Sequence, residues 1–82
     1  MRKQHINAPV NITAVGFRNN LSTYPKRMEY KGFTYNFIDA GLRFIVKSGG
    51  MIREFLTLSD GVSDYYLRKD EHSVNWILLK IV

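Results

Sequence analysis

Few side chains in this chain have the types and spacing that catalysis or metal binding requires. The 82 residues include no cysteine, so thiolate nucleophiles, disulfide bonds and sulfur-ligated metal ions are excluded. The two histidines, His5 and His72, lie near opposite ends of the sequence, and neither stands among further metal ligands. The sequence therefore predicts neither a metal site nor a cofactor.

One group near the C-terminal end has residue types suited to acid–base chemistry. Glu71 and His72 are adjacent, and Arg68 lies just before them. Adjacent residues on a turn point in different directions, and no nearby segment is expected to form a pocket over them. We therefore expect a protein that is not an enzyme. A small basic ribonuclease or toxin using His72, Glu71 and Arg68 is the catalytic alternative.

The positive charge is unevenly distributed along the sequence. Residues 1–47 contain eight Lys and Arg against two Asp and Glu, a balance of +6. Residues 48–82 contain four against five, a balance of −1, and the sum is the formal net charge of +5. A basic excess of this kind attracts an acidic partner, which here would be either nucleic acid or a protein.

The segment 27–47 must position many of these cations, and its strand pairing can be written from the sequence. A two-residue turn at Lys31–Gly32 sets Tyr30 opposite Phe33. The same register sets Met28 opposite Tyr35, so apolar side chains meet on one face.

A second two-residue turn at Ala40–Gly41 would set Phe37 opposite Phe44 and Ile38 opposite Arg43. Both turns place the apolar side chains on the same face of the predicted sheet. This agreement supports the predicted register of the three strands. The residues expected on this inner face are Met28, Tyr30, Phe33, Tyr35, Phe37, Phe44 and Val46.

The opposite face of this predicted sheet is the candidate binding surface. It holds Ile38 and Ile45 close together inside a frame of cations, and such an apolar pair is either covered by another segment or offered to a partner. The loop before the sheet extends the surface. The whole candidate binding surface consists of Arg18, Tyr24, Lys26, Arg27, Ile38, Arg43, Ile45 and Lys47.

Further strands are expected on both sides of this segment. Residues 10–18 are rich in β-branched side chains, and a bulge near Gly16 would reconcile their two faces. The last strand carries apolar groups on both faces, so it should lie between neighbours, with the strand from Val10 meeting the one that ends at Ile81. We expect residues 1–8 to form a flexible arm and residues 9–82 to form one domain.

These elements predict an all-β fold, a small single-domain antiparallel meander of six or seven strands that is closed or nearly closed into a barrel. Its short strands, glycine turns and late Trp76 resemble small β-barrels of the SH3-like or OB type in habit, which does not fix function. The sequence has no apolar signal segment and no long apolar span, so we expect a soluble, cytoplasmic protein without a membrane partner.

Two functional hypotheses follow. The first is a small non-enzymatic binding module that uses the basic sheet face, with nucleic acid as a candidate partner. The second is protein–protein interaction, including self-association as a homodimer, through Ile38 and Ile45. Aliphatic side chains suit a protein interface better than base stacking, which prefers aromatic rings.

Overall fold

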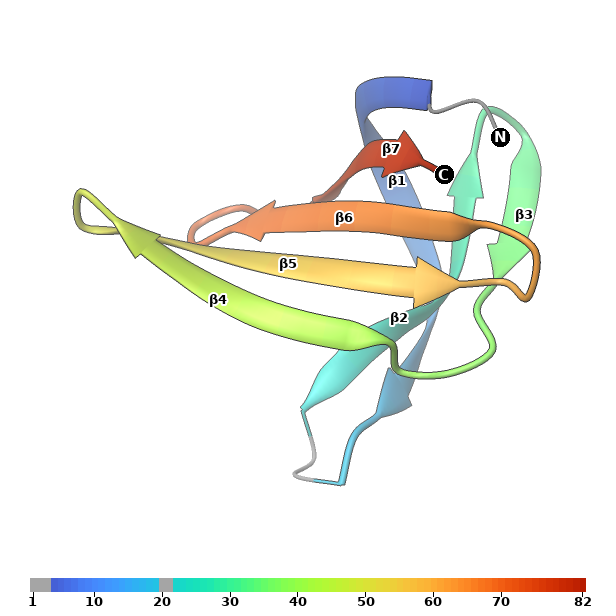
Figure 1. The fold of residues 1–82 in the computed structure, drawn as a ribbon, viewed down its shortest axis with the longest axis horizontal. Helices are drawn as coiled ribbons and strands as arrows, with labels where there is room; N and C mark the ends of the chain where they lie inside the picture. Colours follow the sequence, from blue (N-terminus) through green and yellow to red (C-terminus); the bar gives the residue numbers. More distant parts are fainter. Residues whose placement is uncertain (1–3, 20–21) are drawn as a thin grey trace.

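Seven antiparallel strands make up the fold in the computed structural model, which describes residues 4–19 and 22–82 (Figure 1). The strands are β1 (Gln4–Phe17), β2 (Thr23–Tyr30), β3 (Phe33–Asn36), β4 (Leu42–Ser48), β5 (Met51–Ser59), β6 (Asp64–Asp70) and β7 (Trp76–Ile81). Their order in the single sheet is β3-β2-β1-β7-β6-β5-β4. The prediction of a small all-β fold is therefore confirmed.

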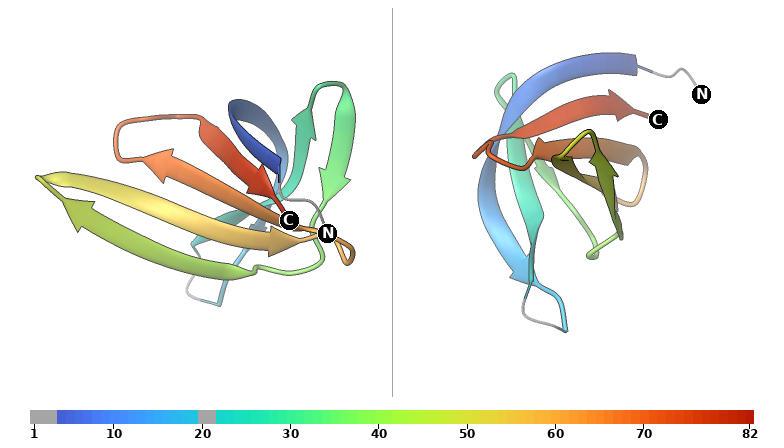
Figure 2. Two further views of the ribbon diagram at one scale, coloured as in Figure 1. Left: turned by 45° about the horizontal axis from the view of Figure 1, so that its top comes forward. Right: turned by 90° about the vertical axis from the view of Figure 1, so that its left-hand side faces the viewer.

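The long strand β1 joins the two halves of the sheet. Its first part pairs with β7, where Val10 lies opposite Trp76. Its second part pairs with β2, where Ile12 lies opposite Met28. Because β1 serves both neighbours along its length, the sheet curls around a shared interior (Figure 2). The predicted pairing of the first strand with the last is confirmed.

Two details of β1 differ from the expectation. The strand begins at Gln4, so residues 4–8 of the expected arm are part of the sheet, and residues 1–3 lie outside the described residues. The irregularity expected near Gly16 lies slightly earlier, because the register with β2 shifts on both sides of Ala14. A bulge of this kind bends a strand, as the double pairing of β1 requires.

The core lies between the two halves of the curled sheet. Leu56, Leu67 and Leu78 lie opposite one another across β5, β6 and β7, and each is at most 1% exposed. The other buried apolar residues are Val10, Met28, Phe37, Leu58 and Tyr65. Burying side chains of this size stabilises a fold by roughly 1.5–3 kcal/mol each, so this cluster is the main source of stability.

The first predicted hairpin is confirmed in its register. Tyr30 lies opposite Phe33, and Met28 lies opposite Tyr35. Lys31 and Gly32 both have positive φ, 51° and 79°, which is the backbone of a type I′ turn.

The second predicted hairpin is wrong, because β3 and β4 lie at opposite edges of the sheet. After β3, the Phe37 N–H donates to the Lys26 carbonyl at 2.9 Å, and the Ile38 N–H donates to the Ser59 carbonyl at 2.9 Å. The chain thus leaves β2 and joins β5 within one residue. β4 then pairs with β5 across the turn at Gly49–Gly50, over the full length of β4.

The wrong hairpin has two consequences. The sheet is not closed into a barrel, since β3 and β4 do not pair. The expected inner face is also only partly correct. Met28 and Phe37 are buried, and Tyr30 and Tyr35 pack against the core. Phe33, Phe44 and Val46 are exposed instead, by 67%, 53% and 40%.

Gly41 bends the connection against β5 rather than closing a hairpin. It has φ of +62°, and a β-carbon added there would collide with the backbone carbonyl of Thr57. The Asp39 carboxylate accepts a hydrogen bond from the Gly41 N–H at 2.9 Å. The glycine is therefore needed for its backbone angle and for a close approach.

Gly41→Ala should destabilise the fold by about 2–4 kcal/mol, because it adds a backbone clash to an unfavourable φ. Gly32→Ala is the matched control, since Gly32 also has positive φ but open space around it, and it should cost about 1 kcal/mol. Urea unfolding of both variants measures the difference. Equal losses would show that Gly41 does not press against β5.

Candidate functional site

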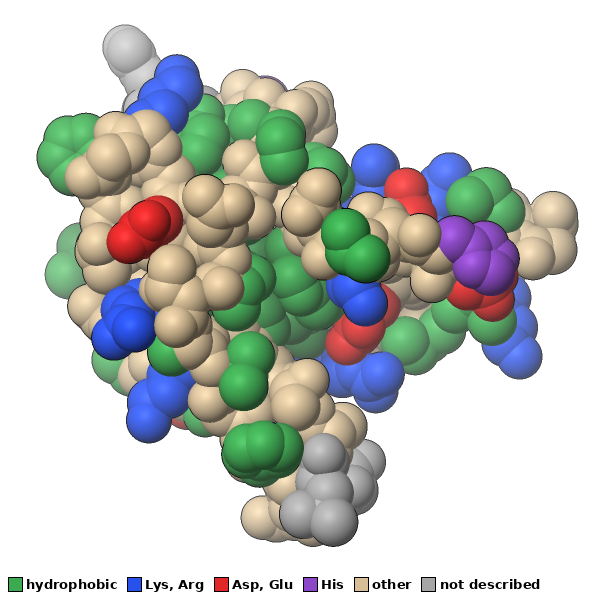
Figure 3. All heavy atoms as spheres, turned by 180° about the vertical axis from the view of Figure 1, so that it is seen from behind, with side chains coloured by type: hydrophobic (Ala, Val, Ile, Leu, Met, Phe, Trp, Pro, Cys, Tyr) green, Lys and Arg blue, Asp and Glu red, His purple; other side chains and the backbone are tan. Residues whose placement is uncertain are grey.

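The strand order distributes the predicted site residues over separate parts of the molecule. Arg27 lies on β2 and Arg43 lies on β4, and the strands β1, β7, β6 and β5 stand between them in the sheet. From behind, Lys and Arg side chains appear in separate groups, and one group is interleaved with acidic side chains (Figure 3). Four strands therefore separate Arg27 from Arg43 along the sheet, where the predicted second hairpin placed one strand between them.

Several of the predicted cations make contacts within the fold. Arg27 donates through Nε to Thr13 Oγ1 at 2.9 Å, and Arg43 Nε lies 2.6 Å from Glu54 Oε2. Both pairs are near the surface, where such contacts contribute little stability. The Glu54 carboxylate does offset the Arg43 charge on β4, whereas the neutral Thr13 hydroxyl leaves the Arg27 charge on β2 in place.

Arg18 and Tyr24 form a structural contact at the far end of β1. The Arg18 Nη2 donates to the Ala40 carbonyl at 2.8 Å, and its guanidinium lies 5.4 Å from the Tyr24 ring centroid. The Tyr24 ring covers Gly16 so closely that a β-carbon there would collide with it. This cluster holds the β1–β2 end against the connection before β4, while Lys26 beside it is exposed.

Ile38 and Ile45 are uncovered but do not form one pair. They are 65% and 43% exposed. Ile38 bonds to Ser59, whereas Ile45 lies opposite Glu54, so the two are about 17 Å apart along β5 at about 3.4 Å per residue. Of the two, only Ile45 lies on the edge strand β4.

The edge strand β4 is exposed along its whole length. Every residue from Leu42 to Ser48 is exposed, and four of the seven are apolar. The apolar residues Leu42, Phe44 and Val46 lie on one face of the strand, and Ile45 lies on the other face between Arg43 and Lys47. Phe44 stacks on Phe55 of β5, with ring centroids 5.3 Å apart, and the β4–β5 hairpin projects beyond the rest of the sheet (Figure 1).

The outer side of β4 also leaves backbone groups without a neighbouring strand. Gly49 and Gly50 form a tight two-residue turn, with φ of 56° and 81°. Such a turn makes its flanking pair a hydrogen-bonded one, so Arg43, Ile45 and Lys47 direct their N–H and C=O groups away from β5. Within residues 4–19 and 22–82, no backbone bond outside the ladder reaches β4.

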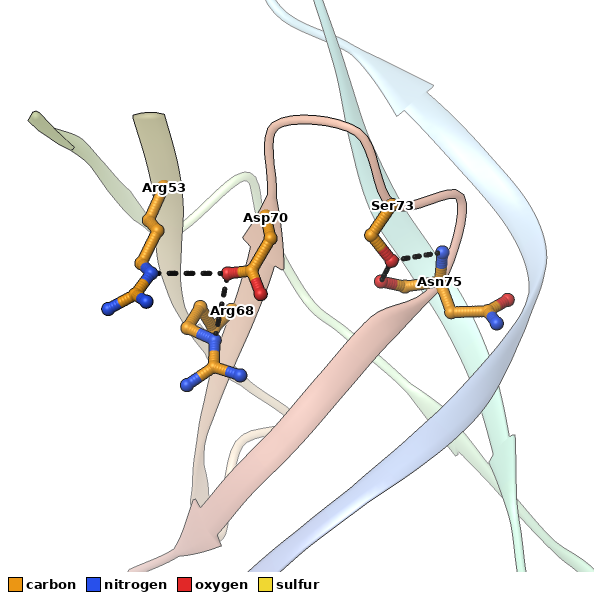
Figure 4. Close-up of polar contacts among 5 residues, drawn as sticks. All are labelled: Arg53, Arg68, Asp70, Ser73 and Asn75. Atoms are coloured by element: carbon orange, nitrogen blue, oxygen red, sulfur yellow. Dashed lines mark hydrogen bonds and ion pairs between the residues drawn. The ribbon is translucent and has the colours of Figure 1, made fainter. Parts of the chain in front are cut away.

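The acid–base group predicted near the C-terminal end lies on an open turn. His72 is 90% exposed, and its Nε2 lies 3.5 Å from Glu71. Arg53 and Arg68 both direct Nε at one Asp70 oxygen, at 3.5 and 3.1 Å, and Ser73 closes a small loop with Asn75 (Figure 4). His72 therefore faces solvent, whereas Arg68 Nε and the Asp70 oxygen that it contacts are buried within an ion cluster on β5 and β6.

Asp60 and Tyr65 form the polar contact nearest the core. The Tyr65 hydroxyl donates to Asp60 Oδ2 at 2.6 Å, and the Ser63 and Val62 N–H groups donate to Oδ1 at 2.8 and 2.9 Å. These bonds, the tyrosine's first, lower the pKa of Asp60 below its usual value. Burial and the hydrogen bond to Asp60 raise the pKa of Tyr65.

A hollow lies at the opposite edge of the sheet from β4. It has a volume of about 460 Å³, and its lining comes from β1, β2, β3 and the turn between β2 and β3. The lining residues are His5, Ile6, Tyr30, Lys31, Phe33 and Tyr35. Sequence reasoning assigned three of these aromatic residues to a closed core face.

Comparisons with protein-family models, with curated proteins and with solved structures found no match for this chain. In the part of the chain that the structure describes, no group of acidic, histidine or cysteine side chains could hold a metal ion. The same part contains no helix of the length and apolarity that a membrane crossing needs.

Asp60→Ala should destabilise the fold by about 1–3 kcal/mol at neutral pH, because the buried Tyr65 hydroxyl loses its acceptor. The lowered pKa of Asp60 means that its contribution is present above the ordinary aspartate pKa of 3.8 and is lost as pH falls through the lower folded value. The variant should therefore lose less stability than the parent between pH 5 and pH 3.

The matched control is Asp64→Ala, because the Asp64 side chain is exposed and makes no hydrogen bond to a described residue. At neutral pH it should keep the stability of the parent within about 0.5 kcal/mol. Thermal melts across the pH range measure all three proteins. Identical pH profiles for Asp60→Ala and the parent would contradict the assigned role of Asp60.

Proposed function

We propose that this protein is a non-catalytic protein-interaction module that associates with a second copy of itself by pairing β4 edge to edge. The main evidence is that β4 is an edge strand with all seven residues exposed and four of them apolar. Natural proteins shorten, charge or cover such an edge, because it pairs readily with another strand. The other edge, β3, has only four residues.

A two-fold axis is the simplest arrangement, since it makes two copies of β4 antiparallel and uses the same surface twice. Residues directly opposite in such a pair lie on the same side of the sheet. The alternation of β4 then leaves two main registers, one centred on Phe44 and one centred on Ile45. The two registers differ in which residues of the second copy lie opposite Arg43 and Lys47.

Charge favours the register centred on Phe44. In the Ile45 register, Arg43 of each copy would lie opposite Lys47 of the other, and like charges in direct opposition are destabilising. In the Phe44 register, Arg43 lies opposite Ile45, Leu42 lies opposite Val46, and the two Phe44 rings meet at the axis. Each ring already stacks on Phe55, so an aromatic cluster continues from one copy into the other.

The proposed contact is small. Pairing two seven-residue strands buries less surface than a stable dimer interface requires, so we expect a weak, concentration-dependent dimer. The same geometry allows β4 to accept a similar strand from another protein, but the charge pattern argued above is specific to two copies of this chain.

Ile45→Lys should weaken the dimer, whereas Ile45→Glu should maintain or strengthen it. In the Phe44 register, position 45 faces Arg43 of the other copy twice, and each charge pair changes the energy by roughly 0.2–1 kcal/mol, so the dissociation constant should shift by roughly 2- to 30-fold in each direction. Sedimentation velocity over a wide concentration range measures both variants.

If the two substitutions at position 45 acted on folding rather than on the dimer, lysine would be the favourable one and glutamate the unfavourable one. Within one copy, Ile45 lies opposite Glu54, so a lysine there is favourable and a glutamate is unfavourable. Ile38→Lys is the matched control, because it adds the same charge to an exposed isoleucine outside β4. Loss of the dimer in both Ile45 variants would indicate the Ile45 register, and a parent protein that stays monomeric at millimolar concentration would contradict the proposal.

A further inference from the structure

The hollow at the β3 edge combines aromatic rings with a lysine and a histidine. Tyr30, Phe33 and Tyr35 contribute three rings, and Phe33 is 67% exposed. Lys31 and His5 stand at the same hollow, and no carboxylate is among the described residues that line it. Its volume of about 460 Å³ is within the range of small-ligand sites.

Two of the three rings are held in place from behind, because Tyr30 and Tyr35 pack against the core. Tyr35 packs on Tyr65 with ring centroids 5.3 Å apart, and Tyr65 packs on Phe37 at the same separation. Tyr65 and Phe37 are both buried in the core. The two tyrosine rings of the hollow therefore rest on the rigid core. A flat ligand ring can stack on them without a rearrangement of the site.

Lys31 is an unusual residue for its position. Both central residues of a type I′ turn need positive φ, and Asn, Asp and Gly are the residues that suit this backbone. Lysine at φ 51° is strained there, and the turn places its ammonium 5.5 Å from the Tyr30 ring centroid, at the mouth of the hollow. Strain of this kind collects at binding sites.

We infer that this hollow binds a nucleobase together with its phosphate, as presented by single-stranded nucleic acid. Bases of a single strand stack on exposed aromatic rings, and lysine neutralises the adjoining phosphate. A duplex hides the faces of its bases, and an acidic peptide would leave the aromatic rings without a flat partner. The site lies at the opposite edge of the sheet from β4 and goes beyond the proposed self-association.

Fluorescence polarisation with a short labelled single strand tests the site. Phe33→Ser should weaken binding about tenfold or more through lost stacking. Lys31→Asn should also weaken it and reduce the salt dependence by about one phosphate contact. The same Lys31→Asn variant should melt at a higher temperature than the parent, because asparagine suits the turn. Opposite effects on binding and stability separate a binding role from a structural one.

Matched controls carry the same substitutions elsewhere. Lys26→Asn removes an exposed cation from β2, and Phe17→Ser removes an aromatic ring that is 69% exposed at the end of β1. Neither control should alter stacking at the hollow, and the matching duplex should bind more weakly than the single strand. Displacement of the probe by adenosine monophosphate would make a free nucleotide the ligand, and displacement by oligonucleotides alone would make it the strand.

Three results would overturn the inference. They are no binding at low salt, parental affinity in both Lys31→Asn and Phe33→Ser, and equal affinity for duplex and single strand. Binding lost in the two control variants, but kept in the two site variants, would place the contact elsewhere and overturn it as well.

Discussion

Two consecutive backbone amides connect strands that lie at opposite ends of the sheet. The Phe37 N–H bonds to β2, and the Ile38 N–H bonds to β5. Because each of these strands lies one place in from an edge, the two bonds draw the edges of the sheet toward each other. Phe37 is buried at this crossing, and its ring contacts Tyr65. The constraint curves the sheet, orders the core and leaves β4 with a neighbour on one side only.

The sequence could predict the first hairpin and not the second because two turns compete for β4. Lys31–Gly32 has no rival, so apolar matching across it fixes the register of β2 and β3. Gly41 and the pair Gly49–Gly50 both flank the strand LRFIVKS, and periodicity does not say which of them reverses the chain. β4 pairs with β5 over its whole length, because this ladder is longer than one with the four-residue strand β3 could be.

The candidate sites show the same limit of sequence reasoning. The alternation of side chains along the strands predicts that Ile38 and Ile45 are exposed. Their separation depends on the crossing at Phe37, which no local sequence pattern predicts. Phe44 and Val46 of β4 are predicted on the core face from a pairing with β3 that does not form, and both are exposed. The aromatic hollow was likewise hidden among expected core residues, although the strained Lys31 before Gly32 was a visible signal.

The crossing at Phe37 and Ile38 is the feature on which the edge strand, the uncovered hollow and both proposals depend. Nuclear Overhauser contacts measured on the labelled protein in solution test it most directly. The account predicts contacts from Phe37 to Lys26 on β2, from Ile38 to Ser59 on β5, and from Ile45 to Glu54 across the β4–β5 ladder. Contacts from Phe37 to Phe44, or from Ile38 to Arg43, would show a β3–β4 hairpin and would contradict it.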